Sequence, residues 1–272
     1  ITDIRTTVFL FCLLFASTDT TASTRRTISN KSNTLLEKSF DNNSMKKIGK
    51  QTKTGISSDV IKGRKKLPEQ KDVIGACMDW LNNPAKVMKW MDRFDLETML
   101  REGGGLIRIS NAFPPHVAEG ILKLLEEIRE EDWNVTEADR DPSTNNIVHR
   151  FWSTKQARGL PEVVRALSVL LPGRLNAFSA GKYERQNHIE PHDDRAYTDV
   201  RMDDGTMVTC SRDIAVVYYL TKDWKAEFGG ELVDVETGDR YVPEFNSIVA
   251  FSVPRYHEVT AVTADRPRHS IF

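Results

Sequence analysis

Apolar residues in the first half of the chain recur mainly at helical spacing. Across 72–101 they fall three or four positions apart, and Asn82-Asn83-Pro84 interrupts them, which predicts two short helices. Apolar side chains also gather on one face in 116–131 and in 160–171, so each of these segments predicts a further helix. Only 106–109 reads as a strand in this half of the chain.

The pattern changes from about residue 176 onward. Short apolar runs, rich in β-branched and aromatic residues, alternate with turn residues, and 212–220 has the composition of a buried strand. The acidic residues Asp199, Asp203 and Asp204 stand before Gly205 and predict a solvated hairpin turn. The chain is therefore expected to be α+β and mainly β, with helical support in 71–175 and a β core in 176–272.

Charge divides the chain, although its net charge is only −1. Residues 25–66 hold 12 Lys and Arg against 3 acidic residues, and they are rich in Ser, Thr and Asn. Segment 24–70 is therefore expected to be a disordered basic linker, either a plain tether or a contact for nucleic acid or an anionic membrane. The remainder from Leu67 onward carries about −9, which argues against a nucleic-acid substrate for the folded domain.

The first 23 residues resemble a targeting segment. Arg5 precedes an apolar run at 8–16, which has the length of a signal-peptide core and is short for a bilayer span. We expect a signal that leads to the endoplasmic reticulum lumen or the secretory pathway, with no stable membrane span unless the signal is uncleaved. A signal anchor, a bipartite peptide for another organelle, and a cytoplasmic location stay open. The chain begins with Ile, so its start is expected to be incomplete.

Three cysteines add little to this picture. Cys12 falls in the expected signal, and Cys77 and Cys210 remain. These two either form a disulfide in an oxidising lumen or stay as separate buried thiols.

The most informative chemistry lies in three residues, His192, Asp194 and His257. Two imidazoles and one carboxylate are the ligands of a facial triad for non-haem Fe(II), which leaves the opposite face of the ion open. In a strand, His192 and Asp194 would share one face, because alternate side chains do. His188 and Glu190 would share that face too. A structural role is expected for His188, and Glu190 is not expected to bind, since a fourth protein ligand would block the open face.

The surroundings of these residues complete a recognisable set. In order, the set comprises Tyr183, Pro191-His192-Asp193-Asp194, Gly229-Gly230-Glu231-Leu232, His257-Glu258-Val259, and an Arg at 266 or 268. With it, 183–272 resembles the 2-oxoglutarate/Fe(II)-dependent dioxygenase superfamily, in its prolyl 4-hydroxylase-like branch. The resemblance implies a double-stranded β-helix, a jelly-roll or cupin-like core buttressed by N-terminal helices.

The resemblance also implies roles for single residues. His192, Asp194 and His257 would bind Fe(II), which with the co-substrates 2-oxoglutarate and O2 would form the reacting centre, and ascorbate would serve as reductant. An Arg would bind the distal carboxylate of 2-oxoglutarate through two parallel hydrogen bonds. Arg266 and Arg268 both qualify, and Arg268 is favoured because it opens a β-like segment after Pro267. The Tyr183 hydroxyl would help hold the co-substrate, unless this side chain simply packs in a core.

The expected reaction is hydroxylation of a peptidyl side chain, with proline favoured, coupled to decarboxylation of 2-oxoglutarate to succinate. The same chemistry on another peptidyl residue or a small molecule stays open, as does a catalytically silent ligand-binding barrel. A zinc hydrolase would lack an evident general base. A peptide or protein partner is expected, and the oligomeric state is not fixed. Because Phe272 falls within the expected last strand, the C-terminus is expected to be truncated.

Overall fold

The computed structural model describes residues 72–171, 177–202 and 204–272, which all lie in one compact unit, Gly63–Phe272. The expected signal, 1–23, and the expected linker, 24–70, lie outside the described residues. Within the described ranges, no helix is both long enough and apolar enough to cross a bilayer.

Five α-helices and two single 3-10 turns are formed by the described residues. Their bounds are α1 Val73–Leu81, α2 Pro84–Met91, α3 Leu96–Glu102, α4 Pro115–Glu126, η1 Glu130–Asp132, α5 Leu160–Ser168 and η2 Ala226–Phe228. The helices α1, α2 and α3 begin after Asp72, Asn83 and Asp95, whose side chains accept hydrogen bonds from backbone N–H groups of the first turn.

The helix predictions need two corrections. Segment 72–101 forms three helices instead of two, because the Asp95 side chain caps a seven-residue helix, α3, that is too short to show a clear apolar period. The helix predicted over 116–131 ends at Glu126, and a 3-10 turn follows. In that turn Arg129 donates two hydrogen bonds of 2.8 Å to the Asp132 carboxylate, a local interaction that apolar spacing does not reveal.

Thirteen strands are formed by the described residues, and every pairing between them is antiparallel. Their bounds are β1 Leu106–Ser110, β2 Asn134–Ala138, β3 His149–Thr154, β4 Ala180–Tyr183, β5 His188–His192, β6 Tyr197–Arg201, β7 Met207–Ser211, β8 Ile214–Tyr219, β9 Leu232–Asp234, β10 Arg240–Tyr241, β11 Ser247–Ser252, β12 His257–Val259 and β13 Arg268–Ile271.

The main sheet curls into a nearly closed barrel. Its strand order is β1-β11-β8-β13-β4-β3-β5-β12-β9-β10, and β2 pairs with β3 at the side of this path. Arg108 on the first strand donates to the Val242 carbonyl beside the last strand and forms an ion pair with Glu244, so side chains link the two edges. The expected double-stranded β-helix with an α+β, mainly β composition is confirmed.

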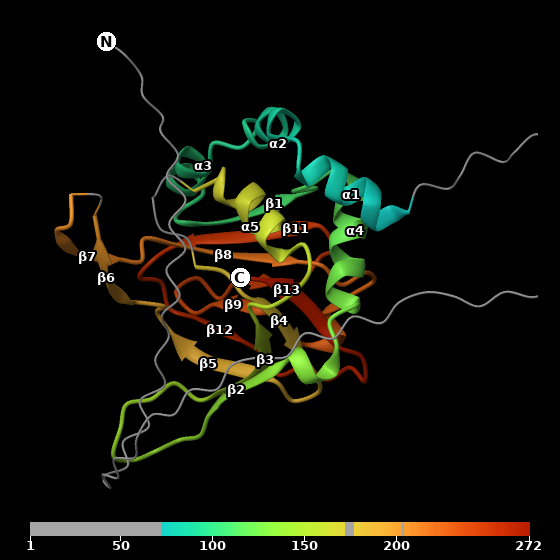
Figure 1. Cartoon of the computed structure of the whole chain (residues 1–272). Helices are drawn as coiled ribbons and strands as arrows, with labels where there is room; N and C mark the ends of the chain where they lie inside the picture. Colours follow the sequence, from blue (N-terminus) through green and yellow to red (C-terminus); the bar gives the residue numbers. More distant parts are fainter. Residues whose placement is uncertain (1–71, 172–176, 203) are drawn as a thin grey trace, which may run out of the picture. The chain divides into compact units, whose positions relative to one another are not determined.

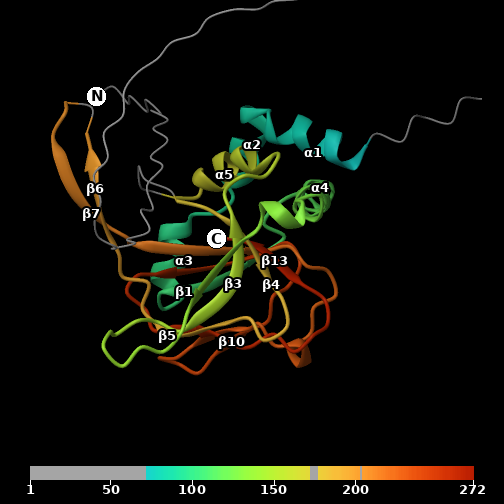
Figure 2. The same cartoon turned by 60° about the horizontal axis from the view of Figure 1, so that its bottom comes forward.

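The helices cover the outside of one half of this barrel. In both views α1, α2, α4 and α5 lie on the same side of the sheet (Figures 1 and 2). Alternation along β8 shows the two faces: Tyr218 packs in the cluster that joins helices to sheet, and the next residue, Tyr219, packs inside the barrel. Both tyrosines are fully buried, as a residue between two apolar layers should be.

Two strands before residue 176, β2 and β3, were not predicted, so the segment expected to supply helical support also supplies part of the sheet. The exposed residues of β2 are Asn134, Val135 and Glu137, and β3 begins with His149 and Arg150, so neither has the apolar alternation of a half-buried strand. They are strands because they pair with each other and because β3 also pairs with β4 and β5.

The strands β6 and β7 form a separate hairpin. Its strands pair only with each other, from Tyr197 opposite Ser211 to Arg201 opposite Met207, and it stands away from the barrel in both views (Figures 1 and 2). Gly205 has φ +86°, which fits the predicted turn. The cysteines stay apart: Cys77 is buried in α1, Cys210 is half-buried in β7, and both are free thiols.

Candidate metal centre

Two imidazoles meet where β5 ends and β12 begins. His192 and His257 stand opposite each other in the strand pair, with ring centroids 4.2 Å apart. The Nδ1 atom of each ring lies 2.8 Å from the carbonyl oxygen two residues earlier in the chain, at Glu190 and at Arg255. These hydrogen bonds use one ring nitrogen and leave Nε2 of each histidine for a metal ion, an arrangement common among histidine ligands.

Asp194 completes the cluster, but not through strand alternation as predicted. The strand β5 ends at His192, and Asp194 has φ +58°, in the left-handed region. Asp is one of the few residues that adopt this conformation readily. The turn brings Asp194 Oδ1 to 3.3 Å from His192 Nε2. One donor atom from each of His192, Asp194 and His257 lies within 4.8 Å of the others, and this is the one such cluster among the described residues.

A β-bulge removes His188 and Glu190 from the face of His192. Pairing advances three residues on β5, from Ile189 to His192, against two on β12. Ile189 therefore packs with the interior aromatic cluster, and His188 is half-buried, with its Nδ1 atom 2.9 Å from the Gln186 carbonyl oxygen. Glu190 forms an exposed ion pair with Arg140. The prediction that His188 and Glu190 share the face of His192 is wrong, since a one-residue bulge reverses which face each side chain takes.

At Asp194 and His257 the surroundings favour the protonation states that a cation requires, and at His192 they favour the protonated ring. Burial opposes the charged form of Asp194, but its hydrogen bond with His192 and the nearby Arg212 outweigh burial and hold the pKa of Asp194 below its usual value. Burial, followed by repulsion from His192, lowers the pKa of His257. Burial also disfavours charge on His192, but the contacts with Asp194 and the Glu190 carbonyl leave its pKa raised. A metal ion would displace that proton.

Arg212 also contacts the cluster, although its place in the sequence gave no sign of such a contact. Its Nη1 atom lies 3.2 Å from Asp194 Oδ1, and its side chain is 39% exposed. Arg212 stands just before β8 and forms part of a predicted strand, so only the fold brings it to Asp194.

Arg268 lies deep inside the barrel. It is 1% exposed, starts β13, and pairs with Tyr183 across β4. Its guanidinium carbon lies 4.0 Å from the centre of the Tyr183 ring and 5.3 Å from that of Tyr219. Nη1 donates to the Gly230 carbonyl at 2.9 Å, and Nε has no hydrogen-bond partner. Among the described residues, no carboxylate pairs with this buried cation.

Two neighbours share the interior with Arg268. Tyr183 is buried and stacks on Phe151, with centroids 5.1 Å apart and planes 6° apart, and burial raises the pKa of its hydroxyl. Tyr183 therefore packs in a core, and its ring faces the cation; a role for its hydroxyl in holding the co-substrate stays a prediction. Ser270, two residues after Arg268 on the same strand face, has a buried Oγ without a hydrogen-bond partner.

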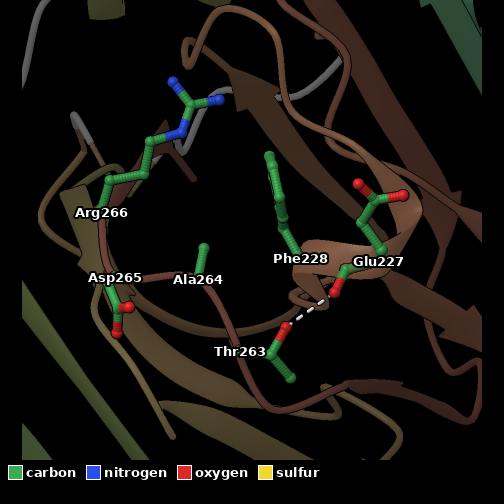
Figure 3. A pocket seen from close by; sticks show the side chains of 6 residues that line it. All are labelled: Glu227, Phe228, Thr263, Ala264, Asp265 and Arg266. Carbon is green, nitrogen blue, oxygen red and sulfur yellow. Dashed lines mark hydrogen bonds between the residues drawn. The ribbon is translucent and has the colours of Figure 1, made fainter.

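Arg266 lies in a different environment. It donates to the carbonyls of Lys222 and Asp223 at the surface. It also lines an open hollow of about 510 Å³ with Phe228, Ala264 and the other residues drawn in Figure 3. The hollow is lined in part by residues that follow Val262, and the Val262 N–H donates to the Asn187 carbonyl just before β5 begins. The metal cluster lies at the other end of β5, at His192. Arg268, and not Arg266, is thus the arginine inside the barrel.

Comparison with known families accounts for this arrangement. The family model described as 2OG-Fe(II) oxygenase superfamily matches residues 178–272, the segment that holds the histidines, Asp194 and Arg268. In sequence, residues 178–272 are therefore similar to this superfamily. The residues of this oxygenase domain fit Fe(II) and 2-oxoglutarate: two imidazoles and a carboxylate converge. A buried guanidinium and a buried hydroxyl keep unused hydrogen-bonding atoms for an anion.

Solved structures similar to this chain catalyse several reactions. A Pseudomonas putida prolyl-4-hydroxylase is 19% identical, over 68% of this chain and 95% of its own, with a TM-score of 0.45. A Trichoplax adhaerens prolyl hydroxylase, solved with a hypoxia inducible factor peptide fragment, is 18% identical, over 69% and 89%, with a TM-score of 0.47. The carbocyclase SnoK of nogalamycin biosynthesis is 15% identical, over 66% and 83%, with a TM-score of 0.48. No curated protein matches this oxygenase sequence.

Proposed function

We propose that this oxygenase domain hydroxylates a peptidyl side chain, with proline as the favoured residue, and converts 2-oxoglutarate to succinate in the same turnover. The observation that carries the oxidative chemistry is the convergence of His192, Asp194 and His257 at one end of a barrel whose interior holds Arg268. When bound, Fe(II) supplies the activation of O2, and the protein supplies binding and orientation.

Each interior residue has a proposed task. His192, Asp194 and His257 hold the iron, and the carbonyls bonded to Nδ1 orient the two rings. Arg268 binds the distal carboxylate of 2-oxoglutarate, because a buried guanidinium without an acidic partner requires an anion to offset its desolvation. Ser270 donates to the same carboxylate. Tyr183 forms a wall of this pocket and holds Arg268 by a cation–π contact.

A polypeptide substrate is supported by apolar side chains around the end of the barrel that holds the metal ligands. Tyr256 directly precedes His257, Val235 directly follows Asp234, which pairs with His257, and Tyr197 starts the hairpin that follows Asp194; all three side chains are exposed. The connections that place these segments there include Val235 N–H to the Tyr256 carbonyl and Arg212 N–H to the Ala196 carbonyl. Exposed apolar groups beside a site are typical of binding surfaces for large partners.

Proline is proposed because the motifs from Tyr183 to Arg268 resemble those of the prolyl 4-hydroxylase-like branch. We propose that the protein acts in the endoplasmic reticulum lumen, because the apolar run at 8–16 resembles the core of a signal peptide. Another organelle is the alternative. Protection of the full chain from protease inside microsomes tests this location.

The decisive experiment measures succinate release from 2-oxoglutarate by the full chain with Fe(II), ascorbate and a panel of proline-rich peptides. Mass spectrometry of the same peptides identifies any hydroxylated residue. Peptide-dependent succinate release with hydroxyproline is expected for wild type, and none is expected for His192→Ala. Succinate release without peptide hydroxylation retains the oxygenase and rejects the peptidyl substrate, whereas no release under any condition indicates a silent barrel.

A further inference from the structure

The residue that orients His257 is itself fixed by a buried ion pair. The Arg255 carbonyl lies 2.8 Å from His257 Nδ1. The Arg255 guanidinium donates to Asp234 Oδ2 at 2.5 Å and to the Gly104 carbonyl at 2.9 Å. The two charged side chains are 11% and 1% exposed. Arg255 is thus held at its backbone and at its side chain, between the strand of His257 and the turn before β1.

Asp234 is built into the same part of the barrel. It stands directly opposite His257 in the pairing of β9 with β12. Its carboxylate accepts from the Glu236 N–H at 3.1 Å and from the Thr237 hydroxyl at 2.8 Å, so it does not depend on Arg255 alone for its position. A fixed carboxylate can hold the longer and more mobile arginine side chain in one rotamer.

The segment of Arg255 also reaches the turn that carries Asp194. The Arg255 N–H points to the Asp193 carbonyl at 3.4 Å, next to the carboxylate ligand. One residue therefore links the backbone around Asp194 with the imidazole of His257, although its side chain does not belong to the donor cluster.

The other histidine provides an internal comparison. His192 Nδ1 also uses the carbonyl two residues earlier, at Glu190, and the Glu190 side chain also forms an ion pair, with Arg140. That pair is exposed, at 35% for Glu190 and 65% for Arg140. Exposed pairs contribute little, whereas breaking a buried pair leaves a charge without compensation. The two histidines have the same local hydrogen bond but different support.

We infer that Arg255 and Asp234 are positioning residues for His257, which fix the imidazole for metal binding without touching the metal. The inference rests on the proposed function and deepens it. The buried pair holds the backbone carbonyl that selects the Nδ1–H tautomer of His257, and thereby presents Nε2 to the ion.

The test compares Arg255→Gln, Arg255→Lys and the exposed control Arg140→Gln in the full chain. Co(II) affinity is measured by titration in the absence of 2-oxoglutarate, and the visible spectrum of Co(II) reports its ligands. Arg255→Gln is expected to weaken Co(II) binding about 10–100-fold and to change the spectrum. Arg140→Gln is expected to change affinity less than about 3-fold, because its pair is solvent-exposed. Arg255→Lys, which keeps the charge beside Asp234, is expected to recover most of the affinity.

Wild-type affinity and spectrum in Arg255→Gln would overturn the inference. If that variant does not fold, Asp234→Asn with Arg255→Gln replaces it, because the double change leaves no buried charge unpaired. The same loss of affinity is expected, and wild-type affinity again overturns the inference.

If wild type binds no Co(II), the proposed function fails. Nitrogen-15 NMR of His257 then tests positioning alone: the Nδ1–H tautomer is expected in wild type and a mixture in the variant, and an unchanged tautomer contradicts the inference.

Discussion

Arg268 lies with its guanidinium carbon 4.0 Å from the centre of the Tyr183 ring, directly across the pairing of β13 with β4. The aromatic face partly compensates the charge, but Nε remains without a hydrogen-bond partner. Arg266, only two residues earlier, lies outside the barrel and bonds to surface carbonyls. The two arginines that sequence spacing left as alternatives therefore have separate environments, and matched substitutions can distinguish them.

The first prediction concerns 2-oxoglutarate binding. Arg268→Gln is expected to weaken it about 30-fold or more, since loss of one partner of a buried, hydrogen-bonded charge pair costs about 2–5 kcal/mol. Arg266→Gln is expected to change it less than about 2-fold. Calorimetric titration of 2-oxoglutarate into the Mn(II)-loaded chain measures both. Equal weakening by the two substitutions would contradict the assignment of Arg268.

A second prediction follows for stability without ligands. Arg268→Met replaces a buried cation that has no carboxylate partner among the described residues with an apolar side chain of similar length. Such replacements are often stabilising by about 1–4 kcal/mol. Urea unfolding of the metal-free chain is expected to show a higher free energy of unfolding for the variant. A large destabilisation would mean that Arg268 holds the empty barrel together.

The sequence was sufficient to predict which three residues form the metal site, but not the local geometry that brings them together. Histidine and aspartate types in the right order, with Gly-Gly-Glu-Leu between them, pointed to His192, Asp194 and His257, and the structure brings all three together. The physical reason given for His192 and Asp194 was wrong. Strand alternation assumes a regular strand, whereas β5 carries a bulge and Asp194 adopts a left-handed turn.

Residues that act through neighbours left no such pattern. Arg212, Arg255 and Asp234 belong to no motif; tertiary folding brings Arg212 and Asp234 to the cluster and pairs the Arg255 side chain with Asp234. The strands β2 and β3 were missed for a related reason, because strand pairing and not their own apolar pattern stabilises them. A local sequence pattern shows which secondary structure a segment favours, but it does not show which distant segment will pair with it.

A third prediction concerns stability against pH. Burial, followed by repulsion from Lys182 and Arg268, lowers the pKa of His269 from 6.5 to about 4. Above pH 6.5 the residue is neutral in both folded and unfolded chains. As the pH falls toward 4, the unfolded chain binds the proton first, so stability is lost at up to about 1.4 kcal/mol per pH unit.

Substitution of His269 by Gln removes this dependence. Urea unfolding of the metal-free chain at pH 7.5, 5.5 and 4.5 is expected to show a shallower loss of stability for His269→Gln than for wild type. The difference between the two chains should change by on the order of 2–3 kcal/mol between pH 7.5 and 4.5. Parallel curves would show that His269 accepts its proton equally well in the folded chain.

A fourth prediction tests the contact between α1 and α4. A Cβ atom at Gly120 would lie 2.2 Å from Cys77 Cβ, so Gly120→Ala is expected to destabilise the chain by about 1–3 kcal/mol through overpacking. At Gly75, inside α1, the nearest atom would lie 3.8 Å away. Gly75→Ala is expected to be neutral or stabilising by up to about 1 kcal/mol, because alanine favours helices. Thermal unfolding of both variants measures the contrast.

The measurement that tests the central claim most directly is an anaerobic titration of the full chain with Fe(II) in the presence of 2-oxoglutarate. Wild type and the control His188→Ala, which changes a histidine outside the donor cluster, are each expected to bind one equivalent of Fe(II), with a visible absorption band that requires 2-oxoglutarate. His192→Ala and Asp194→Ala are expected to bind none at the same concentrations. Equal iron uptake by His192→Ala, or no uptake by wild type, would contradict the claim that His192, Asp194 and His257 bind Fe(II).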